Sequence, residues 1–180
     1  METSLPGVCE LLPQVFRDAR GFFLEAFHQK RYADIGIPDS FVQDNQSFST
    51  KGTLRGLHYQ LEHPQAKLCR VVEGEALDVA VDIRWGSPTF GKWTSVLLSA
   101  ETLNQIYIPG GFAHGFVVVS GVVQFLYKCS DFYDPKDERG IVWNDPALNI
   151  SWGIDDPVLS PRDAASPRLA DIPKAMLPRY

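Results

Sequence analysis

Two histidines and two cationic side chains lie in segments that should form strands, and together they could carry out acid–base chemistry. His58 lies in TLRGLHYQ (residues 53–60), three residues after Arg55, and His114 lies in IPGGFAHGF (residues 108–116). An imidazole has an ordinary pKa near neutrality, so it can act as a general base. Lys67 begins another strand-like run, and its charge could stabilise negative charge created on a substrate.

Each of these residues also has a purely structural interpretation. A single histidine in a strand is more often a packing residue than a catalytic one, and Lys67 alone would be an exposed lysine at a strand end. Two histidines, each close to a glycine in an apolar strand, favour a shared cavity. His28 lies in a polar run and His63 precedes a proline in a loop, so neither is a candidate.

Alternating apolar residues predict an all-β fold. In ALDVAVDIR (residues 76–84), apolar side chains alternate with polar or small ones, as in a half-buried strand. Many short strands without intervening helices indicate an antiparallel sandwich or barrel. Turns are expected at residues 73–75, 86–88 and 120–121, between runs that read GFFLEAF, AKLCRVV, WTSVLLS, NQIYIP, HGFVVVS and VVQFLYKC. Short helices are expected within residues 28–36 and from Ser160, with Pro161 as the first helical residue.

Composition and charge indicate one globular domain over residues 1–180. The chain is 44% hydrophobic and 22% charged, and a proline-rich C-terminal tail from about residue 146 should run over the barrel surface. The net charge of −5 argues against a nucleic-acid partner. Residues 102–127 contain no charged side chain but several turn residues, so they predict buried strands rather than a membrane span.

The cysteines indicate a reducing compartment. Cys9, Cys69 and Cys129 are odd in number and far apart, which fits neither a disulfide framework nor a zinc motif. The first residues lack the basic start and apolar run of a signal peptide. We therefore expect a cytoplasmic protein.

The spacing of Pro109, Gly111 and His114 resembles the second motif of cupins, a superfamily of jelly-roll barrels. Metal-binding cupins also carry a His-x-His pair in the first motif, where this chain has His58, Tyr59 and Gln60. Two imidazoles without a dedicated carboxylate make a poor transition-metal site. The resemblance therefore favours the barrel without a metal, and His58 would work as a plain acid or base.

A series of motifs along the chain closely resembles one family. From about Pro6 to Asp163 the chain reads, in order, VFRDARGFFLEAF, FVQDNQS, LRGLHYQ, AKLCR, DVAVDIR, SPTFGKW, IPGGFAHGF, FLYKCSDFY and WNDP. Together these motifs resemble the dTDP-4-dehydrorhamnose 3,5-epimerases of the cupin superfamily. The resemblance implies a cupin-type antiparallel jelly-roll barrel with a few short peripheral helices and no cofactor. It also implies an isomerase of dTDP-rhamnose biosynthesis, which serves cell-envelope polysaccharides.

The family's reaction assigns chemical roles by motif. The substrate, dTDP-4-dehydro-6-deoxy-D-glucose, has a ketone at carbon 4 that acidifies the hydrogens on carbons 3 and 5, and inverting both carbons gives dTDP-4-dehydro-L-rhamnose. By resemblance His58 is the base, Tyr127 the acid on the opposite face, and Lys67 the cation at the enolate oxygen. Asp163 resembles the aspartate that orients the base. Its spacing from Ser160 is also that of a capping box, so both roles stay open.

The resemblance also implies a binding set and partners. Arginines suit a diphosphate because their planar fork binds two phosphate oxygens, so Arg55 would hold the ligand that His58 deprotonates. Many relatives have lysine where this chain has Arg162. The expected partners are the dTDP-sugar and a second copy in a homodimer, with GFFLEAF as the docking or exchanged strand. The positions matched to nucleotide or sugar contacts are Arg20, Glu25, Gln43, Asp44, Asn45, Arg55, His114, Tyr133, Glu138 and Arg162.

Several other functions compete with double epimerisation. A relative that inverts a single carbon is the nearest, although Tyr133 matches the tyrosine of many double epimerases. A ketoisomerase of the same fold would not be expected to match RGLHYQ and FLYK together. A metal-dependent cupin oxygenase would contain bound metal, and a non-catalytic sugar-nucleotide-binding barrel would bind without exchanging substrate hydrogens.

Overall fold

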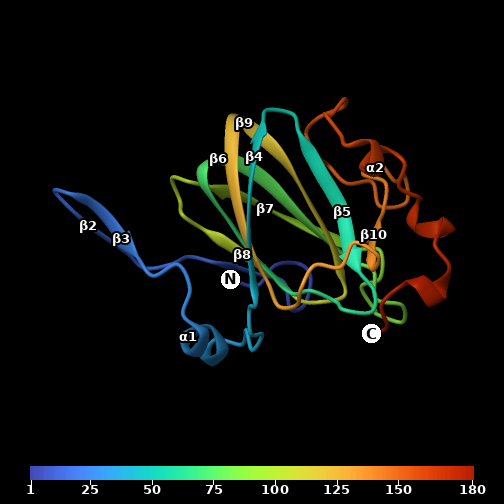
Figure 1. Ribbon diagram of the computed structural model, residues 1–180, viewed down its shortest axis with the longest axis horizontal. Helices are drawn as coiled ribbons and strands as arrows, with labels where there is room; N and C mark the ends of the chain where they lie inside the picture. Colours follow the sequence, from blue (N-terminus) through green and yellow to red (C-terminus); the bar gives the residue numbers. More distant parts are fainter.

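The computed structural model describes residues 1–180 and shows an antiparallel β barrel with a few short helices at its periphery (Figure 1). The prediction of a cupin-type, all-β fold is confirmed. The two α-helices are α1 (Gln29–Asp34) and α2 (Pro161–Ala164), and single 3-10 turns lie at Leu169–Asp171 and Lys174–Met176. The strands are β1 (Cys9–Leu11), β2 (Val15–Asp18), β3 (Gly21–Leu24), β4 (Gln43–Thr50), β5 (Leu54–Gln60), β6 (Lys67–Asp82), β7 (Trp93–Ser99), β8 (Gln105–Ile108), β9 (Phe112–Cys129) and β10 (Glu138–Gly140).

The barrel is built on the two long strands β6 and β9, which pair with each other along most of their length. The first part of β6 also pairs with β8 and its second part with β7, whereas β9 pairs first with β5 and then with β4. The sheet order is β1-β8-β6-β9-β5-β10, and all pairs are antiparallel. Each long strand therefore belongs to both layers of the barrel.

Two predicted turns were wrong because they lie inside these strands. Residues 73–75 fall within β6 and residues 120–121 within β9, where the register between the two strands shifts. Gly74 has a φ of +74°, and a Cβ there would lie 1.9 Å from the carbonyl oxygen of Val122. The bulge needs glycine, and it lets both strands bend into the second layer without ending.

The bulge also decides which side chains face the barrel interior. Before it, Cys69 and Val71 belong to the interior cluster, and after it Ala76 and Ala80 do, so the inward positions change from odd to even numbers. The sequence predicted one exposed polar face for residues 76–84. Instead Asp78 and Asp82 on that face are fully buried.

The opposite face of β6 is covered by the C-terminal part of the chain. Val79 and Val81 pack in one cluster with Leu148, Trp152 and Leu169. The predicted course of the tail over the barrel surface therefore has an energetic reason, since it keeps this apolar face from water. Both predicted helices are present, and Ser160 caps α2 by accepting a hydrogen bond from the backbone of Asp163. None of the helices is long and apolar enough to cross a membrane.

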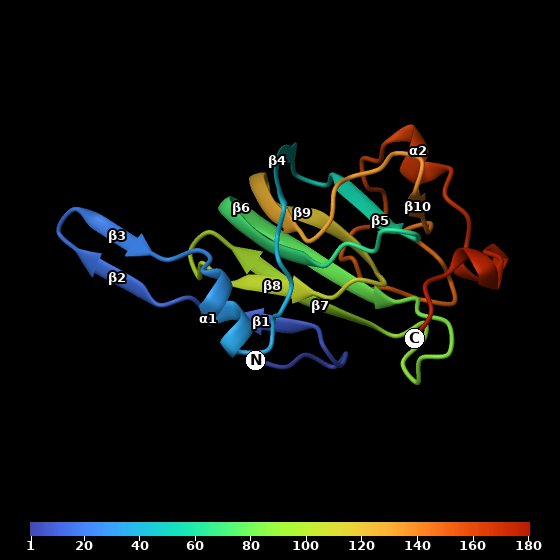
Figure 2. The ribbon, with the colours of Figure 1, turned by 60° about the horizontal axis from the view of Figure 1, so that its bottom comes forward.

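The hairpin of β2 and β3 extends away from the barrel as an arm (Figure 2). We call residues 15–24 the arm. Each of its three phenylalanines exposes more than half of its surface, namely Phe16 (54%), Phe22 (55%) and Phe23 (68%). Exposed aromatic side chains grouped in this way are typical of a contact surface.

Candidate active site

A bulge in β5 explains how Arg55 and His58, three residues apart on one strand, come to face the same side. In a regular strand, residues three apart face opposite sides. Here Arg55 pairs with Phe116 and His58 with His114, so three residues of β5 span two of β9. Arg55 and His58 therefore both face a cavity, while Leu54 and Leu57 pack in the core beside it. Gly56 permits this crossing, because a Cβ there would lie 2.6 Å from the Cα atom of Gly115.

The cavity lies inside the barrel and has a volume of about 560 Å³. Strand β4 contributes every second residue, Gln43, Asn45 and Ser47, as the strand period requires. Of the residues predicted for the site, the cavity lining contains Gln43, Asn45, Arg55, His58, Lys67, His114, Tyr127, Tyr133, Glu138, Arg162 and Asp163. One cavity therefore holds all four of the residues predicted to be catalytic.

His58 and Asp163 form a close pair. The Nε2 atom of His58 lies 2.7 Å from Oδ1 of Asp163, whose side chain is 5% exposed. Burial by itself would raise the pKa of Asp163, but the hydrogen bond and charge of His58 and the backbone N–H of Gly56 hold that pKa below its ordinary value. The aspartate is thus a carboxylate that accepts a hydrogen bond from the N–H group at Nε2, which leaves Nδ1 of His58 as the basic nitrogen.

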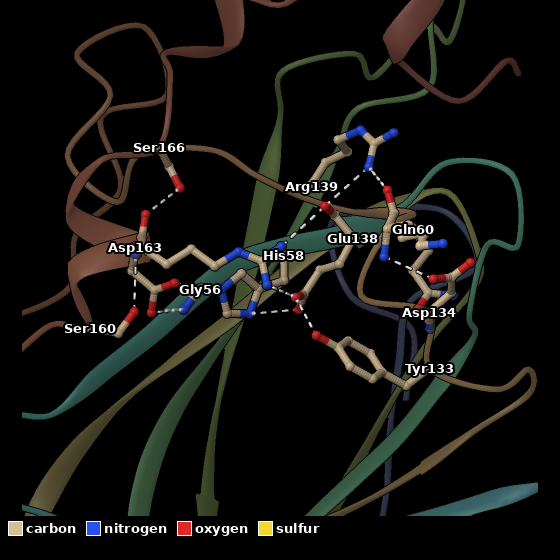
Figure 3. A network of polar contacts seen from close by, with 12 residues as sticks. Gly56, His58, Gln60, Tyr133, Asp134, Glu138, Arg139, Ser160, Asp163 and Ser166 are labelled. Carbon is tan, nitrogen blue, oxygen red and sulfur yellow. Dashed lines mark hydrogen bonds and ion pairs between the residues drawn. The ribbon is translucent and has the colours of Figure 1, made fainter.

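The two open roles of Asp163 are compatible in the structure. Its backbone N–H donates to Oγ of Ser160 at 3.0 Å, so the serine caps α2, while its carboxylate turns toward β5. The cap positions the carboxylate, and α2 rests against β5 with its aspartate at His58 (Figure 3). Asp163 is therefore placed both to begin a helix and to orient an imidazole.

Replacing Asp163 by asparagine tests this orientation. The amide keeps the volume but can donate to Nε2, which would favour the tautomer whose basic nitrogen faces away from the cavity. We expect Asp163→Asn to lower kcat by about tenfold to a hundredfold with the thermal midpoint little changed. Ser160→Ala, which removes only the cap, should instead cost about 1 kcal/mol of stability. A fully active Asp163→Asn protein would rule out the orienting role.

A second carboxylate faces the basic nitrogen of His58. Oε1 of Glu138 lies 3.9 Å from Nδ1, and Oε2 accepts a hydrogen bond from the hydroxyl of Tyr133 at 2.9 Å (Figure 3). Arg162 forms an ion pair with the same carboxylate and also donates to the backbone carbonyl of Glu138 at 3.1 Å. Glu138 is thus held by two neighbours beside His58, where its charge would stabilise an imidazolium.

Lys67 and Tyr127 stand together on the neighbouring strands β6 and β9. The Nζ atom of Lys67 lies 5.3 Å from the centre of the Tyr127 ring and donates to Oε1 of Gln65 at 3.3 Å. Burial, with smaller contributions from Cys129, Cys69 and Glu138, raises the pKa of Tyr127 to about 12 against an opposing effect of Arg55. Tyr127 therefore keeps its proton at neutral pH and can donate it.

Three of the predicted binding residues lie outside the cavity lining of the single chain. Asp44 faces the other side of β4 and forms an ion pair with Lys128 at 2.8 Å. Arg20 is at the end of the arm, paired with Asp18, and Glu25 follows the arm, paired with Arg31. The outward direction of Asp44 follows from the alternation of side chains along β4, so it could have been predicted from the sequence. The position of the arm could not have been predicted in this way.

Two residues that bind predicted site residues were not predicted from the sequence. Ser49 accepts a hydrogen bond from Nε of Arg55 at 3.1 Å, and Gln65 accepts one from Lys67. Ser49 could have been found, since it continues the period-two series of Gln43, Asn45 and Ser47. Gln65 lies in a loop, and no pattern indicates its direction.

A jelly-roll barrel that holds a histidine–aspartate pair, a lysine and a protonated tyrosine in one cavity is a cupin-type barrel equipped for acid–base chemistry. Comparisons with known proteins identify the branch of this class. Residues 2–171 match the sequence model of dTDP-4-dehydrorhamnose 3,5-epimerase. The chain therefore belongs to the dTDP-4-dehydrorhamnose 3,5-epimerase family, a family of isomerases.

Individual relatives agree with this assignment. The dTDP-4-dehydrorhamnose 3,5-epimerase of Shigella flexneri is 53% identical over 95% of this chain and 96% of its own length. That of Neisseria gonorrhoeae is 51% identical over 98% of this chain, which spans about half (54%) of that relative. The crystal structure of dTDP-6-deoxy-D-glucose-3,5-epimerase from Legionella pneumophila, in complex with dTDP-4-keto-L-rhamnose, superposes with a TM-score of 0.97 at 51% identity, covering 100% of this chain and 97% of the other.

Proposed function

We propose that the chain converts dTDP-4-dehydro-6-deoxy-D-glucose into dTDP-4-dehydro-L-rhamnose by inverting carbons 3 and 5. The observation that carries this proposal is the His58–Asp163 pair, in one cavity with Lys67 and Tyr127. The family assignment supports the substrate and the reaction. Incubation with the ketosugar nucleotide, borohydride reduction and sugar analysis should yield L-rhamnose and its carbon-4 epimer. Recovery of only 6-deoxy-D-glucose and its carbon-4 epimer would contradict it.

Each inversion begins with proton transfer to His58. The Nδ1 lone pair takes the hydrogen next to the ketone, the electron pair left on carbon becomes part of the enolate, and negative charge moves to the ketone oxygen. Lys67 stabilises that oxygen, and Glu138 and Asp163 stabilise the imidazolium. The enolate carbon then takes the hydroxyl proton of Tyr127 from the opposite face. The tyrosinate is reprotonated from solvent, and the imidazolium of His58 returns its proton to solvent, so both groups are reset.

The remaining lining residues hold the ligand. Arg55 binds the diphosphate, and its guanidinium is already steered by Ser49. Gln43 and Asn45 present amide groups that suit a nucleobase, which both donates and accepts hydrogen bonds. On the other side Tyr133, Glu138 and Arg162 form a linked set at the sugar, with His114 deeper in the barrel.

Tyr127→Phe separates the two halves of each inversion. The base face still works without the phenol hydroxyl, so exchange of the hydrogen with solvent should continue while inversion falls. We expect completed inversion to drop by on the order of a hundredfold, and exchange at the attacked carbon by less than tenfold. Proton NMR in heavy water measures both rates in one sample. If both rates fall equally, Tyr127 binds or packs and does not act as the acid.

We further propose that two copies form a homodimer through their arms. The exposed phenylalanines of the arm need a partner surface, and Arg20 and Glu25 lie outside their own cavity. Docking of the arm on the second copy would bring these two residues to a ligand. The proposed compartment is the cytoplasm, in which all three cysteines would stay free, as they are in the structure.

The dimer is tested by charging the arm. Phe23→Asp places a carboxylate on the most exposed of its phenylalanines and should convert dimers into monomers, because a buried unpaired charge is costly. Phe132→Asp is the matched control, since Phe132 is 64% exposed but lies outside the arm. Sedimentation velocity at micromolar concentration gives the masses. A monomeric unmutated protein would contradict the proposal.

A further inference from the structure

A thiol, a carboxylate and an imidazole meet inside the barrel, behind the proposed active site. Cys69 and Asp78 of β6 and His114 of β9 are all buried, and their ligand atoms lie within 4.8 Å of one another. Nε2 of His114 lies 2.8 Å from Oδ2 of Asp78 and 3.9 Å from Sγ of Cys69. The proposed reaction uses neither Cys69 nor Asp78, so it does not explain why these two side chains lie beside His114.

These separations are close to those around a single tetrahedral metal ion. Zinc–nitrogen and zinc–oxygen bonds of about 2.0 Å and a zinc–sulfur bond of about 2.3 Å put neighbouring ligand atoms roughly 3.3 to 3.6 Å apart. The two separations from His114, 2.8 Å and 3.9 Å, differ from these values by about half an ångström, and all three ligand atoms lie within 4.8 Å of one another, so binding would draw them together by side-chain rotation. The paired strands β6 and β9 hold the backbone of all three residues in one ladder.

Asp78 has an oxygen without a partner, which independently indicates a missing ligand. Asp78 is fully buried, and its Oδ1 atom makes no hydrogen bond. Asp82, on the same inward face and equally buried, has its oxygens bonded by Arg84, Ser87 and Thr89. A buried carboxylate oxygen is rarely left unsatisfied in this way, and a cation would satisfy it.

We propose that Cys69, Asp78 and His114 form a binding site for a zinc-like divalent transition-metal ion. Thiolate and imidazole donors select such an ion over magnesium or calcium, which prefer oxygen. On binding, the thiol proton leaves to solvent and the ion joins two anions and a neutral imidazole, so the filled site carries no net charge. Because His114 lines the cavity, the ion can enter there, and water or a ligand atom completes the coordination.

A filled site would act on the active site through His114. In the empty site the Asp78 carboxylate accepts a hydrogen bond from the N–H group at Nε2, and Nδ1, which has no partner in the chain, is an acceptor. A metal on Nε2 moves the ring proton to Nδ1, which becomes a donor. Burial and the charge of Asp78 raise the pKa of the Cys69 thiol, and Lys67, two residues before it on β6, lowers it, so the ion itself must displace the thiol proton.

Cobalt titration tests the site on the whole reduced protein after removal of metals with a chelator. We expect one Co²⁺ per chain, with an intense near-ultraviolet thiolate-to-cobalt band and the strong visible bands of tetrahedral cobalt. Zinc should displace the cobalt and abolish both. Cys69→Ala should lose the thiolate band. Cys129→Ala, which removes an equally buried thiol outside the cluster, should keep it.

Any of three results would overturn the proposal: no saturable binding of one ion per chain, binding without a thiolate band, or a thiolate band that survives Cys69→Ala. X-ray absorption of the zinc-loaded, unmutated protein gives an answer that does not depend on a variant's folding, with one sulfur and otherwise nitrogen or oxygen ligands expected.

Zinc should also slow epimerisation by the unmutated protein and not by Cys69→Ala. Equal slowing of both would exclude the action through His114. The spectra do not depend on the substrate, so they stand even if the proposed function fails.

Discussion

His58→Ala should lower the turnover of the 4-ketosugar nucleotide by on the order of a thousandfold while the barrel stays folded. The side chain is 30% exposed and faces the cavity, so its loss leaves no void in the packed core. Without it, the chain has no other imidazole paired with Asp163. Both exchange and inversion should stop, because neither proceeds before a proton leaves carbon.

His63→Ala is the matched control for His58→Ala. His63 is more exposed (61%) and pairs weakly with Asp131, outside the cavity lining. His63→Ala keeps the backbone N–H that donates to Asp137, so it should leave turnover unchanged. Steady-state rates and the affinity for dTDP should be measured for both variants. Turnover by a folded His58→Ala protein within about tenfold of the unmutated rate would remove His58 as the base.

Lys67→Met should have the second largest effect, with kcat lowered on the order of a hundredfold or more. The reaction develops negative charge on the ketone oxygen, and an ammonium stabilises that charge more than it stabilises the neutral ketone. Methionine keeps most of the length of the lysine stem while deleting the ammonium, whose Nζ atom lies 5.3 Å from the centre of the Tyr127 ring. Lys92→Met, an exposed substitution outside the cavity lining, is the matched control.

The affinity for dTDP distinguishes this role from phosphate binding. dTDP lacks the ketosugar, so Lys67→Met should change its dissociation constant by less than about threefold, whereas Arg55→Ala should weaken binding by tenfold or more. Arg55 would meet the diphosphate in the ground state and the transition state alike. If Lys67→Met weakens dTDP binding and leaves kcat intact, Lys67 is a phosphate contact and the enolate needs another stabiliser.

The elements that hold the site could largely be predicted, because their periodicity is local. The strand that contains residues 76–82 and the cap at Ser160 are properties of neighbouring residues and both are present, although the polar face expected on that strand is buried. The turns expected at residues 73–75 and 120–121 were wrong, because glycine and serine occur in bulges as well as in turns. Only the pairing of β6 with β9, which is not local, decides between the two.

The same bulges explain which parts of the site the sequence could not show. Cys69 and Asp78 are an odd number of residues apart on one strand, so simple alternation places them on opposite faces. The register shift at Gly74 brings both inside the barrel beside His114. Likewise, the bulge at Gly56 puts Arg55 and His58 in one cavity. The His58 and Tyr127 roles came from family resemblance, since spacing alone does not relate strands far apart in the chain.

Proton NMR of the reaction in heavy water tests the central claim most directly, that His58 and its partners deprotonate and invert both carbons next to the ketone. With dTDP-4-dehydro-6-deoxy-D-glucose and the unmutated protein, the signals of the hydrogens on carbons 3 and 5 should both disappear as deuterium replaces them, and the couplings of the product should be those of the L-rhamno configuration. His58→Ala should leave both signals in place. Loss of one signal only would restrict the protein to a single carbon, and retention of both by the unmutated, ligand-binding protein would contradict the account.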